Sequence, residues 1–377
     1  MLPSILRDSA VRVVFGAGRL AELGGLAAEL GAKRVLVVTD PGIIAAGHVE
    51  RGAESLRRAG LNVTVFDGAH ENPTTEHVDA GVAVAKDAGI AFIVGLGGGS
   101  AMDCAKGINI ILTNGGAIRD YWGVDKTTDR MLPLIAVPTT AGTGSEAQSF
   151  ALISDPVTRQ KMACGDRRPP VEGGLRPRAA ILDPDLTRTA PAAVTAATGI
   201  DAIAHAVETA ATTQRSENSR ALSTLAWQLL EPAFGKVARD PDDAPARADM
   251  LLGAHLAGAA IEQSMLGAAH ACANPLTAKA GVIHGVAVGV MLPHVVRFNS
   301  EGGDNPYADL DADAERLASR IDALLKAGGL PSRLSACGVT EGILPELADI
   351  AAEQWTAGFN PRQAGSSEYL EIYRGAW

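Results

Sequence analysis

The chain has 377 residues, of which 47% are hydrophobic and 20% are charged, and its formal net charge is −10. This composition is that of a globular protein, and the length suggests two domains. An acidic chain without a basic tract argues against nucleic acid or an anionic membrane surface as a partner.

The cysteines are few and far apart. The four of them (Cys104, Cys164, Cys272 and Cys337) form no CxxC pair. We expect reduced thiols in a cytoplasmic protein rather than a disulfide framework. The N-terminal residues "MLPSILRDSAVRVVFGAG" lack the basic and apolar regions of a signal peptide. No apolar run approaches the roughly 18 residues that span a bilayer.

The first half of the chain alternates strand-like with helix-like segments. Five β-branched or apolar runs predict strands at residues 34–40, 62–68, 91–100, 131–140 and 179–184. Helix-like stretches at 47–59 and 76–88 separate the first three runs. This alternation predicts a mostly parallel sheet that helices cover on both faces.

Strand-like runs almost vanish after residue 190. A helical pattern begins at Pro191 and is followed by three further helical segments, "RALSTLAWQLLEPAFGKVA", "ARADMLLGAHLAGAAIEQSM" and "DAERLASRIDALLKAG". We therefore predict an α/β domain over residues 1–187 and an all-helical domain over 188–377. Two segments rich in turn-forming residues, 165–178 and 300–308, are predicted to be loops.

A glycine-rich turn marks the first candidate site. In "IVGLGGGSAMDCAKG", a buried strand runs into three glycines, and Ser100 then opens a helix. Glycines allow backbone N–H groups to approach a ligand, and a helix N-terminus favours an anion, so this arrangement suits a phosphate. A tight strand–helix turn without a ligand is the alternative interpretation. A second turn, "PTTAGTGSE" (138–146), also follows a strand and is expected to line the same sheet edge.

An acidic residue ends the predicted strand at residues 34–40. Asp40 is placed to accept a hydrogen bond from a ribose hydroxyl. It precedes the glycine turn instead of following it by about 20 residues, so the strand order must differ from that of the usual dinucleotide-binding fold.

The second candidate site begins with "GIDAIAHAVE" (199–208). Asp201 and His205 are four residues apart, so they share one face of a helix and can converge on one metal ion. An Asp–His hydrogen bond, or two residues touching solvent, is the alternative. His270 and His284 complete an Asp-His-His-His set suited to Fe²⁺ or Zn²⁺. His255 and His294 are expected to be ordinary core residues.

These motifs together resemble the iron-containing, or group III, alcohol dehydrogenases. The resemblance rests on "GGGSAMDCAKG", "PTTAGTGSE", "GIDAIAHAVE", the histidines at 270 and 284, and "LPHV", and it covers nearly the whole chain. It implies a Rossmann-like α/β dinucleotide-binding domain followed by an all-α domain, with metal and nicotinamide meeting in the cleft between the two. It further implies an NAD(P)-linked enzyme that forms a homodimer or a larger homo-oligomer.

The resemblance assigns roles to individual positions. The metal ligands it implies are Asp201, His205, His270 and His284. The pyrophosphate is assigned to Gly98, Gly99 and Ser100, with Asp103 nearby. The remaining cofactor positions are Asp40, which favours NAD over NADP, Asn72 near the adenosine, and Thr139, Thr140, Thr143, Lys161 and Leu182 around the nicotinamide and its ribose.

Two features depart from the family pattern. Many members carry a histidine four residues after the third ligand as a proton relay, and here that position is Asn274. An amide does not titrate near neutral pH, so it cannot relay a proton as imidazole does. The Pro/Arg-rich loop after Lys161 is also longer than usual.

The expected reaction is metal-assisted hydride transfer between a nicotinamide and a small alcohol or aldehyde. Dehydroquinate synthase and glycerol dehydrogenases share the two-domain plan, but their metal sites typically lack the Asp-x-x-x-His of 201–205. A specialised reductase resembling maleylacetate reductase is a closer alternative. A non-catalytic NAD-binding regulatory protein is the alternative from another class.

Overall fold

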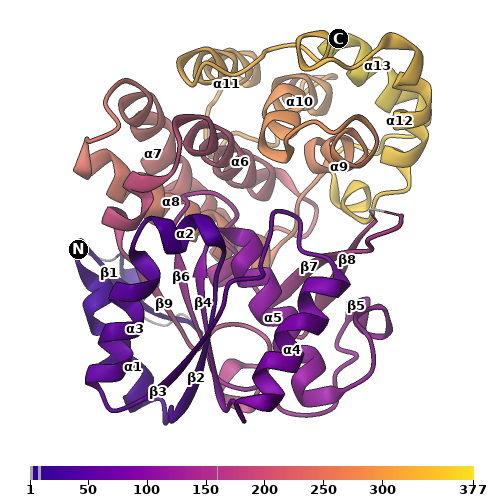
Figure 1. The fold of residues 1–377 in the computed structure, drawn as a ribbon. Coiled ribbons are helices and arrows are strands. Elements are labelled where there is room, and N and C mark those ends of the chain that lie inside the picture. The colour runs from indigo at the N-terminus through magenta and orange to yellow at the C-terminus, as the bar shows by residue number, and fades with distance from the viewer. Residues whose placement is uncertain (1–2, 7–9, 159) are drawn as a thin grey trace. The chain divides into compact units, whose positions relative to one another are not determined.

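A computed structural model describes residues 3–6, 10–158 and 160–377 (Figure 1). The chain divides into two compact units. Unit 1 contains the described residues up to Thr140 together with Ser145–Thr189, and unit 2 contains Ala141–Gly144 and Ala190–Trp377. The short segment 141–144 joins unit 2 through close backbone contacts. A Cβ atom on Gly144 would lie only 2.5 Å from the Cα atom of Gly258.

Unit 1 is built on a six-stranded sheet of order β1-β9-β6-β4-β2-β3 in which every neighbouring pair is parallel. Its strands are β1 (Arg12–Phe15), β2 (Arg34–Val38), β3 (Asn62–Phe66), β4 (Phe92–Gly97), β6 (Leu134–Pro138) and β9 (Ala179–Leu182). The five predicted strands and the parallel sheet are confirmed. The order also confirms the unusual topology, because β4, which precedes the glycine turn, lies between β2 and β6.

Both faces of this sheet are covered, as the alternation along β2 shows. Leu36 and Val38 belong to one apolar core, and Val35 and Val37 belong to another on the opposite face. Figure 1 shows one pair of helices on each side of the sheet. These are α1 (Leu23–Glu29) and α3 (His48–Arg58) on one side, and α4 (Thr75–Asp87) and α5 (Gly99–Asn114) on the other. A short helix, α2 (Pro41–Ala45), follows β2.

A second, three-stranded sheet was not predicted. It has the order β5-β8-β7, with strands at Gly123–Val124 (β5), Phe150–Ser154 (β7) and Lys161–Gly165 (β8). The segments "FALIS" and "KMACG" contain few β-branched residues, so their composition gives little strand signal. The antiparallel pairing of β7 with β8 brings them together. The loops predicted at 165–178 and 300–308 are largely irregular, as expected.

Unit 2 is helical, as predicted. Its helices are α6 (Ala192–Ala211), α7 (Glu217–Arg239), α8 (Ala244–Gln263), α9 (Ala268–Ala280), α10 (His284–Asn299), α11 (Ala314–Ala327), α12 (Leu344–Ala352) and α13 (Ser366–Ala376). Helix α6 packs against α7, α8 and α10, and its many alanines and its one glycine, Gly199, permit that burial on several sides. All four cysteines are free thiols. Within the described residues, no helix is long and apolar enough to span a membrane.

Candidate metal centre and nucleotide-binding turn

One face of α6 carries three polar side chains in an otherwise apolar helix. Asp201, His205 and Glu208 occupy positions i, i+4 and i+7, and each residue is 5% exposed or less. Side chains at this spacing lie above one another on a helix. Buried charged and titratable groups require partners, and these three find theirs on α9 and α10.

The other two predicted ligands lie near the starts of their helices. His270 is in the first turn of α9, and His284 is the first residue of α10. The start of α10 approaches α6 very closely, because a Cβ atom on Gly285 would lie 2.0 Å from the carbonyl oxygen of Ala197. Only glycine permits this approach, which brings His284 to the buried face of α6.

The three predicted histidine ligands all lie close to Asp201. Asp201 Oδ1 lies 3.5 Å from His270 Nε2, 3.6 Å from His205 Nε2 and 4.0 Å from His284 Nε2. The rings of His205 and His270 stack with their centroids 4.9 Å apart. Ligand atoms of Asp201, His270 and His284 all lie within 4.8 Å of one another, the geometry expected of a metal site.

These distances fit a divalent cation. A tetrahedral ion about 2.1 Å from each ligand separates the ligand atoms by about 3.4 Å. Asp201 Oδ1 and His270 Nε2 are buried and make no hydrogen bond. Buried polar atoms without partners are rare in folded proteins, and the binding of an ion is one recognised reason for them. The donor set therefore fits a metal ion better than it fits a hydrogen-bond network.

The electrostatics of the cluster favour the ligating forms of two groups. Burial alone would raise the pKa of Asp201, but the adjacent His205, His284 and His270 hold that pKa well below its usual range. Burial is the main cause that lowers the pKa of His205, so its imidazole is neutral near pH 7. Burial also acts to lower the pKa of His270, but Glu208 and Asp201 outweigh it and raise that pKa to about 9.

The glycine turn of unit 1 lies between β4 and α5. Gly97 has φ of 157°, and a Cβ atom there would lie 2.7 Å from the Cβ atom of Ala101. Gly98 is the N-cap of the 16-residue helix α5, so the N–H groups of the next residues, including Ser100, open the helix. This is the strand–glycine–helix arrangement that suits a phosphate.

The second turn and Asp40 reach the same sheet edge. Gly97 pairs with Pro138, and the N–H of Thr139 donates to the Gly97 carbonyl at 3.0 Å. Asp40 follows the neighbouring strand β2 and caps α2, its Oδ1 accepting from the N–H of Ile43 at 3.1 Å. The turns after β2, β4 and β6 therefore lie side by side.

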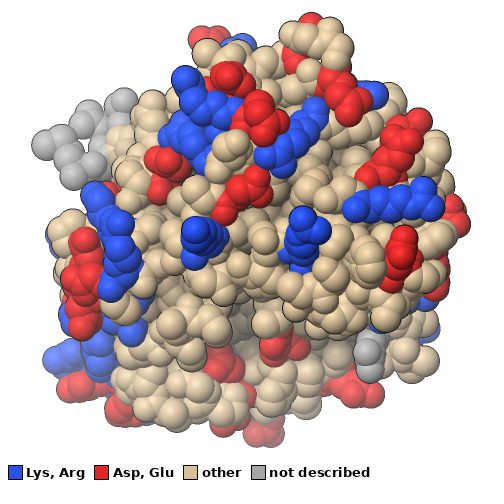
Figure 2. Space-filling view, turned by 90° about the horizontal axis from the view of Figure 1, so that it is seen from above, with Lys and Arg blue, Asp and Glu red and all other residues tan. Residues whose placement is uncertain are grey.

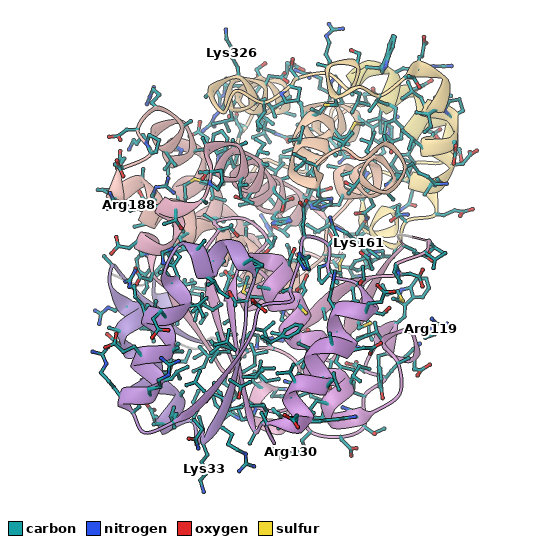
Figure 3. The ribbon with its side chains drawn as sticks, viewed as in Figure 1. Lys33, Arg119, Arg130, Lys161, Arg188 and Lys326 are labelled. Atoms are coloured by element: carbon teal, nitrogen blue, oxygen red, sulfur yellow. The ribbon has the colours of Figure 1, made fainter. Side chains whose placement is uncertain are left out.

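The remaining predicted cofactor residues occupy varied places in the fold. Asp103 lies on α5, where its Oδ1 accepts from Ser145 Oγ at 2.7 Å, and burial raises its pKa. Lys161 begins β8, and Figure 3 places it at the end of unit 1 opposite Lys33, the residue before β2. Thr140 follows β6, and Thr143 belongs to unit 2. Leu182 is fully buried at the end of β9. Asn72 lies in the loop before α4 and has φ of 52°.

The surface shows no large patch of one charge on the face drawn in Figure 2, where acidic and basic side chains are interspersed. That face accords with the absence of a basic tract in the sequence.

Comparison with known proteins identifies the family. The family model "Iron-containing alcohol dehydrogenase" matches residues 10–184, and "Fe-containing alcohol dehydrogenase family, C-terminal" matches residues 195–377. The chain belongs to the iron-containing alcohol dehydrogenase family.

Individual relatives agree with this assignment. Alcohol dehydrogenase 4 of Schizosaccharomyces pombe is 35% identical over 96% of this chain and 87% of the relative. The NAD-dependent methanol dehydrogenase of Bacillus methanolicus is 33% identical over 96% of this chain and 97% of its own. A crystal structure of 1,3-propanediol oxidoreductase superposes with a TM-score of 0.90 at 34% identity, covering 97% of this chain and 98% of that one. The protein is thus an oxidoreductase acting on CH–OH groups, a metal-dependent alcohol dehydrogenase or aldehyde reductase.

Two features of this family member were missed by sequence reasoning. Glu208 lies within the quoted motif "GIDAIAHAVE", but it received no role because its partners are about 60 residues away in the chain. Asn274 was singled out, but its partner was not: its side-chain amide donates to Gln354 Oε1 at 3.1 Å. His255 and His294 lie on α8 and α10 outside the cluster of ligand atoms, as expected.

Proposed function

We propose that Asp201, His205, His270 and His284 hold a ferrous ion, and that the protein uses NAD for the reversible oxidation of a small primary alcohol to its aldehyde. The convergence of three imidazole Nε2 atoms on Asp201 Oδ1 within a buried helical core carries the metal assignment. The NAD-dependent methanol dehydrogenase among the relatives supports the cofactor. Zn²⁺ binds such a donor set more tightly than Fe²⁺, so the metal found in the cell depends on availability.

The metal residues would each have a defined task. When bound, the metal supplies Lewis acidity toward an alcohol or carbonyl oxygen, and the nicotinamide supplies the hydride chemistry. Asp201 contributes one negative charge, which partly neutralises a divalent ion. Three neutral imidazoles add no further charge. With four protein ligands, a substrate oxygen would bind as a fifth ligand, since catalytic metal sites can expand to five-coordination.

The nucleotide residues would work mainly through the backbone. The N–H groups of Gly98, Gly99 and Ser100, at the start of α5, would bind the pyrophosphate where the helix dipole favours an anion. The Asp40 carboxylate would accept a hydrogen bond from the 2′-hydroxyl of NAD and repel the 2′-phosphate of NADP. The other proposed contacts are those of Asn72, Asp103, Thr139, Thr140, Thr143, Lys161 and Leu182.

Proton release must bypass Asn274. Its amide nitrogen already donates to Gln354, and an amide does not take up and release a proton near neutral pH as imidazole does. We infer that the proton of the alcohol leaves through water or a ribose hydroxyl of the nucleotide.

The domain boundaries, the oligomeric state and the cellular location remain predictions. Residues 1–187 would form the dinucleotide-binding domain and 188–377 the metal-binding domain. A homodimer or larger homo-oligomer follows from the family resemblance. A cytoplasmic location follows from the four widely spaced cysteines, which are free thiols.

The test is metal-dependent turnover. Protein stripped of metal is given Fe²⁺ anaerobically, or Zn²⁺, and NADH is followed optically with a panel of alcohols and aldehydes. We expect activity only with metal, its loss in His270→Ala, and its retention in His294→Gln, a matched histidine change elsewhere in unit 2. NADH binding with no turnover under any of these conditions would refute the proposal and favour a non-catalytic nucleotide-binding protein.

A further inference from the structure

Glu208 is a buried acidic residue of α6 that the set of metal ligands leaves unexplained. Glu208 lies about one helical turn beyond His205 and is only 4% exposed. Both carboxylate oxygens are used. Oε2 is hydrogen-bonded to His270 Nδ1. Oε1 accepts from the N–H groups of Gly267 at 3.1 Å, Ala269 at 2.8 Å and His270 at 3.4 Å.

These contacts fix the start of helix α9. The first N–H groups of a helix have no partner within the helix. Glu208 takes three of them, and Asn360 Oδ1 takes the N–H of Ala268 at 3.2 Å. A Cβ atom on Gly267 would crowd these caps, because it would lie 3.0 Å from Asn360 Oδ1 and 3.3 Å from Glu208 Oε1. The turn that carries His270 is therefore held by side chains of distant segments.

The same carboxylate also decides which ring nitrogen of His270 is available. A carboxylate accepts hydrogen bonds, so the ring nitrogen facing Glu208, Nδ1, carries the hydrogen. In the neutral ring, the lone pair then lies on Nε2, which faces Asp201 Oδ1 at 3.5 Å. A carboxylate behind a ligating imidazole fixes its tautomer and orientation and raises its basicity as a ligand.

We propose that Glu208 is a positioning residue for the metal centre, which fixes both the tautomer of His270 and the place of the α9 turn that carries it. The proposal rests on the proposed metal site, since His270 must be a ligand for its tautomer to matter. A purely structural cap of α9 is the competing role, and one substitution separates the two.

Glu208→Gln preserves the cap and reverses the tautomer. Three N–H donors face one side of the side chain, so the amide oxygen of Gln must take that side. The NH₂ group then faces Nδ1, which must accept, and the ring hydrogen moves to Nε2. An imidazole with hydrogen on Nε2 cannot ligate through that atom. A structural cap alone predicts unchanged metal binding.

The experiment titrates the stripped full-length protein with Co²⁺ by calorimetry and records the visible Co²⁺ spectrum. We expect Glu208→Gln to raise the Co²⁺ Kd by about 10–100-fold and to change the spectrum. The control is Ser223→Ala, which removes a buried hydroxyl bonded to Thr209 on α6 but touches no ligand. It should leave the Kd unchanged. A wild-type Kd in Glu208→Gln overturns the proposal.

Two further measurements keep the outcomes distinct. If His270→Ala and Asp201→Ala also bind Co²⁺ like the wild type, the metal site itself is wrong. If they lose Co²⁺ while Glu208→Gln keeps it, only the role of Glu208 fails. Should Glu208→Gln not fold, ¹⁵N-histidine NMR of the Zn²⁺-loaded wild type decides. A strongly downfield Nδ1–H proton on His270 is expected, and its absence overturns the proposal.

Discussion

Replacing Gly285 by alanine should damage the metal centre without altering any ligand. Gly285 follows His284 at the start of α10 and faces the backbone of Ala197 on α6. The added Cβ atom would lie 2.0 Å from the Ala197 carbonyl oxygen and 2.8 Å from its carbon. Because both atoms belong to the backbone of a buried helix, no side-chain rotation can relieve the contact.

The size of the effect follows from that distance. Restoring an ordinary contact of about 3.4 Å requires α10 to move away from α6 by about 1.4 Å, since close-packed interiors leave no slack. Metal–ligand distances are held within about 0.2 Å, so this movement takes His284 out of ligand range. We expect a loss of roughly 1–3 kcal/mol in folding stability from overpacking. We expect metal affinity to fall at least about tenfold, the lower end of the effects seen for perturbed ligand placement.

The assay combines Co²⁺ calorimetry, NADH fluorescence and thermal unfolding on the same preparations. The matched control is Gly235→Ala on α7, where an added Cβ atom has nothing within 4 Å. That change should stabilise the helix by roughly 0.5–1 kcal/mol and leave metal binding unchanged. In Gly285→Ala, NADH binding should persist while Co²⁺ binding weakens. Unaltered Co²⁺ affinity in a folded Gly285→Ala protein would show that the approach of α10 to α6 does not set the position of His284.

Three other outcomes follow from the structure. Asp40→Asn keeps an N-cap acceptor for α2 but removes the negative charge. The ratio of kcat/KM for NADP⁺ to kcat/KM for NAD⁺, measured by steady-state kinetics, should therefore rise about tenfold or more. An unchanged ratio would mean that Asp40 does not contact the 2′ position of the nucleotide. Removing the metal with a chelator should abolish turnover and lower Tm but leave NADH affinity, measured by fluorescence, within about twofold; loss of NADH binding would contradict separate sites. Hydrogen bonds from Arg316, with help from Arg320, lower the pKa of the buried Asp311 to about 2. A depressed pKa stabilises the fold above the unfolded-state value near 4, and that stability is lost as the pH falls toward 2. Asp311→Asn should therefore cost about 1–2 kcal/mol in urea unfolding at pH 7 and progressively less at pH 4 and 3, whereas a pH-independent cost would exclude the ion pairs as the cause.

The metal cluster was largely predictable from the sequence because helical spacing is a geometric constraint. Asp201 and His205 had to share a face of α6 once that segment was helical. The assignment of His270 and His284 to the same metal site rested on their residue type and on the family resemblance. Spacing alone could not show it, since α9 and α10 are separate helices whose packing depends on tertiary contacts. The glycine turn was predictable for a similar local reason, because a strand, glycines and a helix follow one another directly.

What the sequence concealed is the support behind the ligands. Glu208 binds N–H groups that lie about 60 residues further along the chain. Asn360 reaches the same helix from about 90 residues beyond it. No local pattern reports such pairs. The requirement for glycine at position 285 was also not predictable. One glycine beside a histidine does not indicate that a Cβ atom there would lie 2.0 Å from a backbone oxygen.

The two candidate sites are therefore built on different principles. The nucleotide turn relies on backbone N–H groups within one strand–helix connection, so its geometry is fixed by adjacent residues. The metal cluster instead joins three helices, and α6 sets the distances among them. Through Asp201 and His205 it supplies two ligands, and through Glu208 it holds α9 in place. Its backbone limits how closely α10 can approach. A displacement of α6 would thus move two ligands relative to both of the others, whereas a displacement of α9 would move His270 alone.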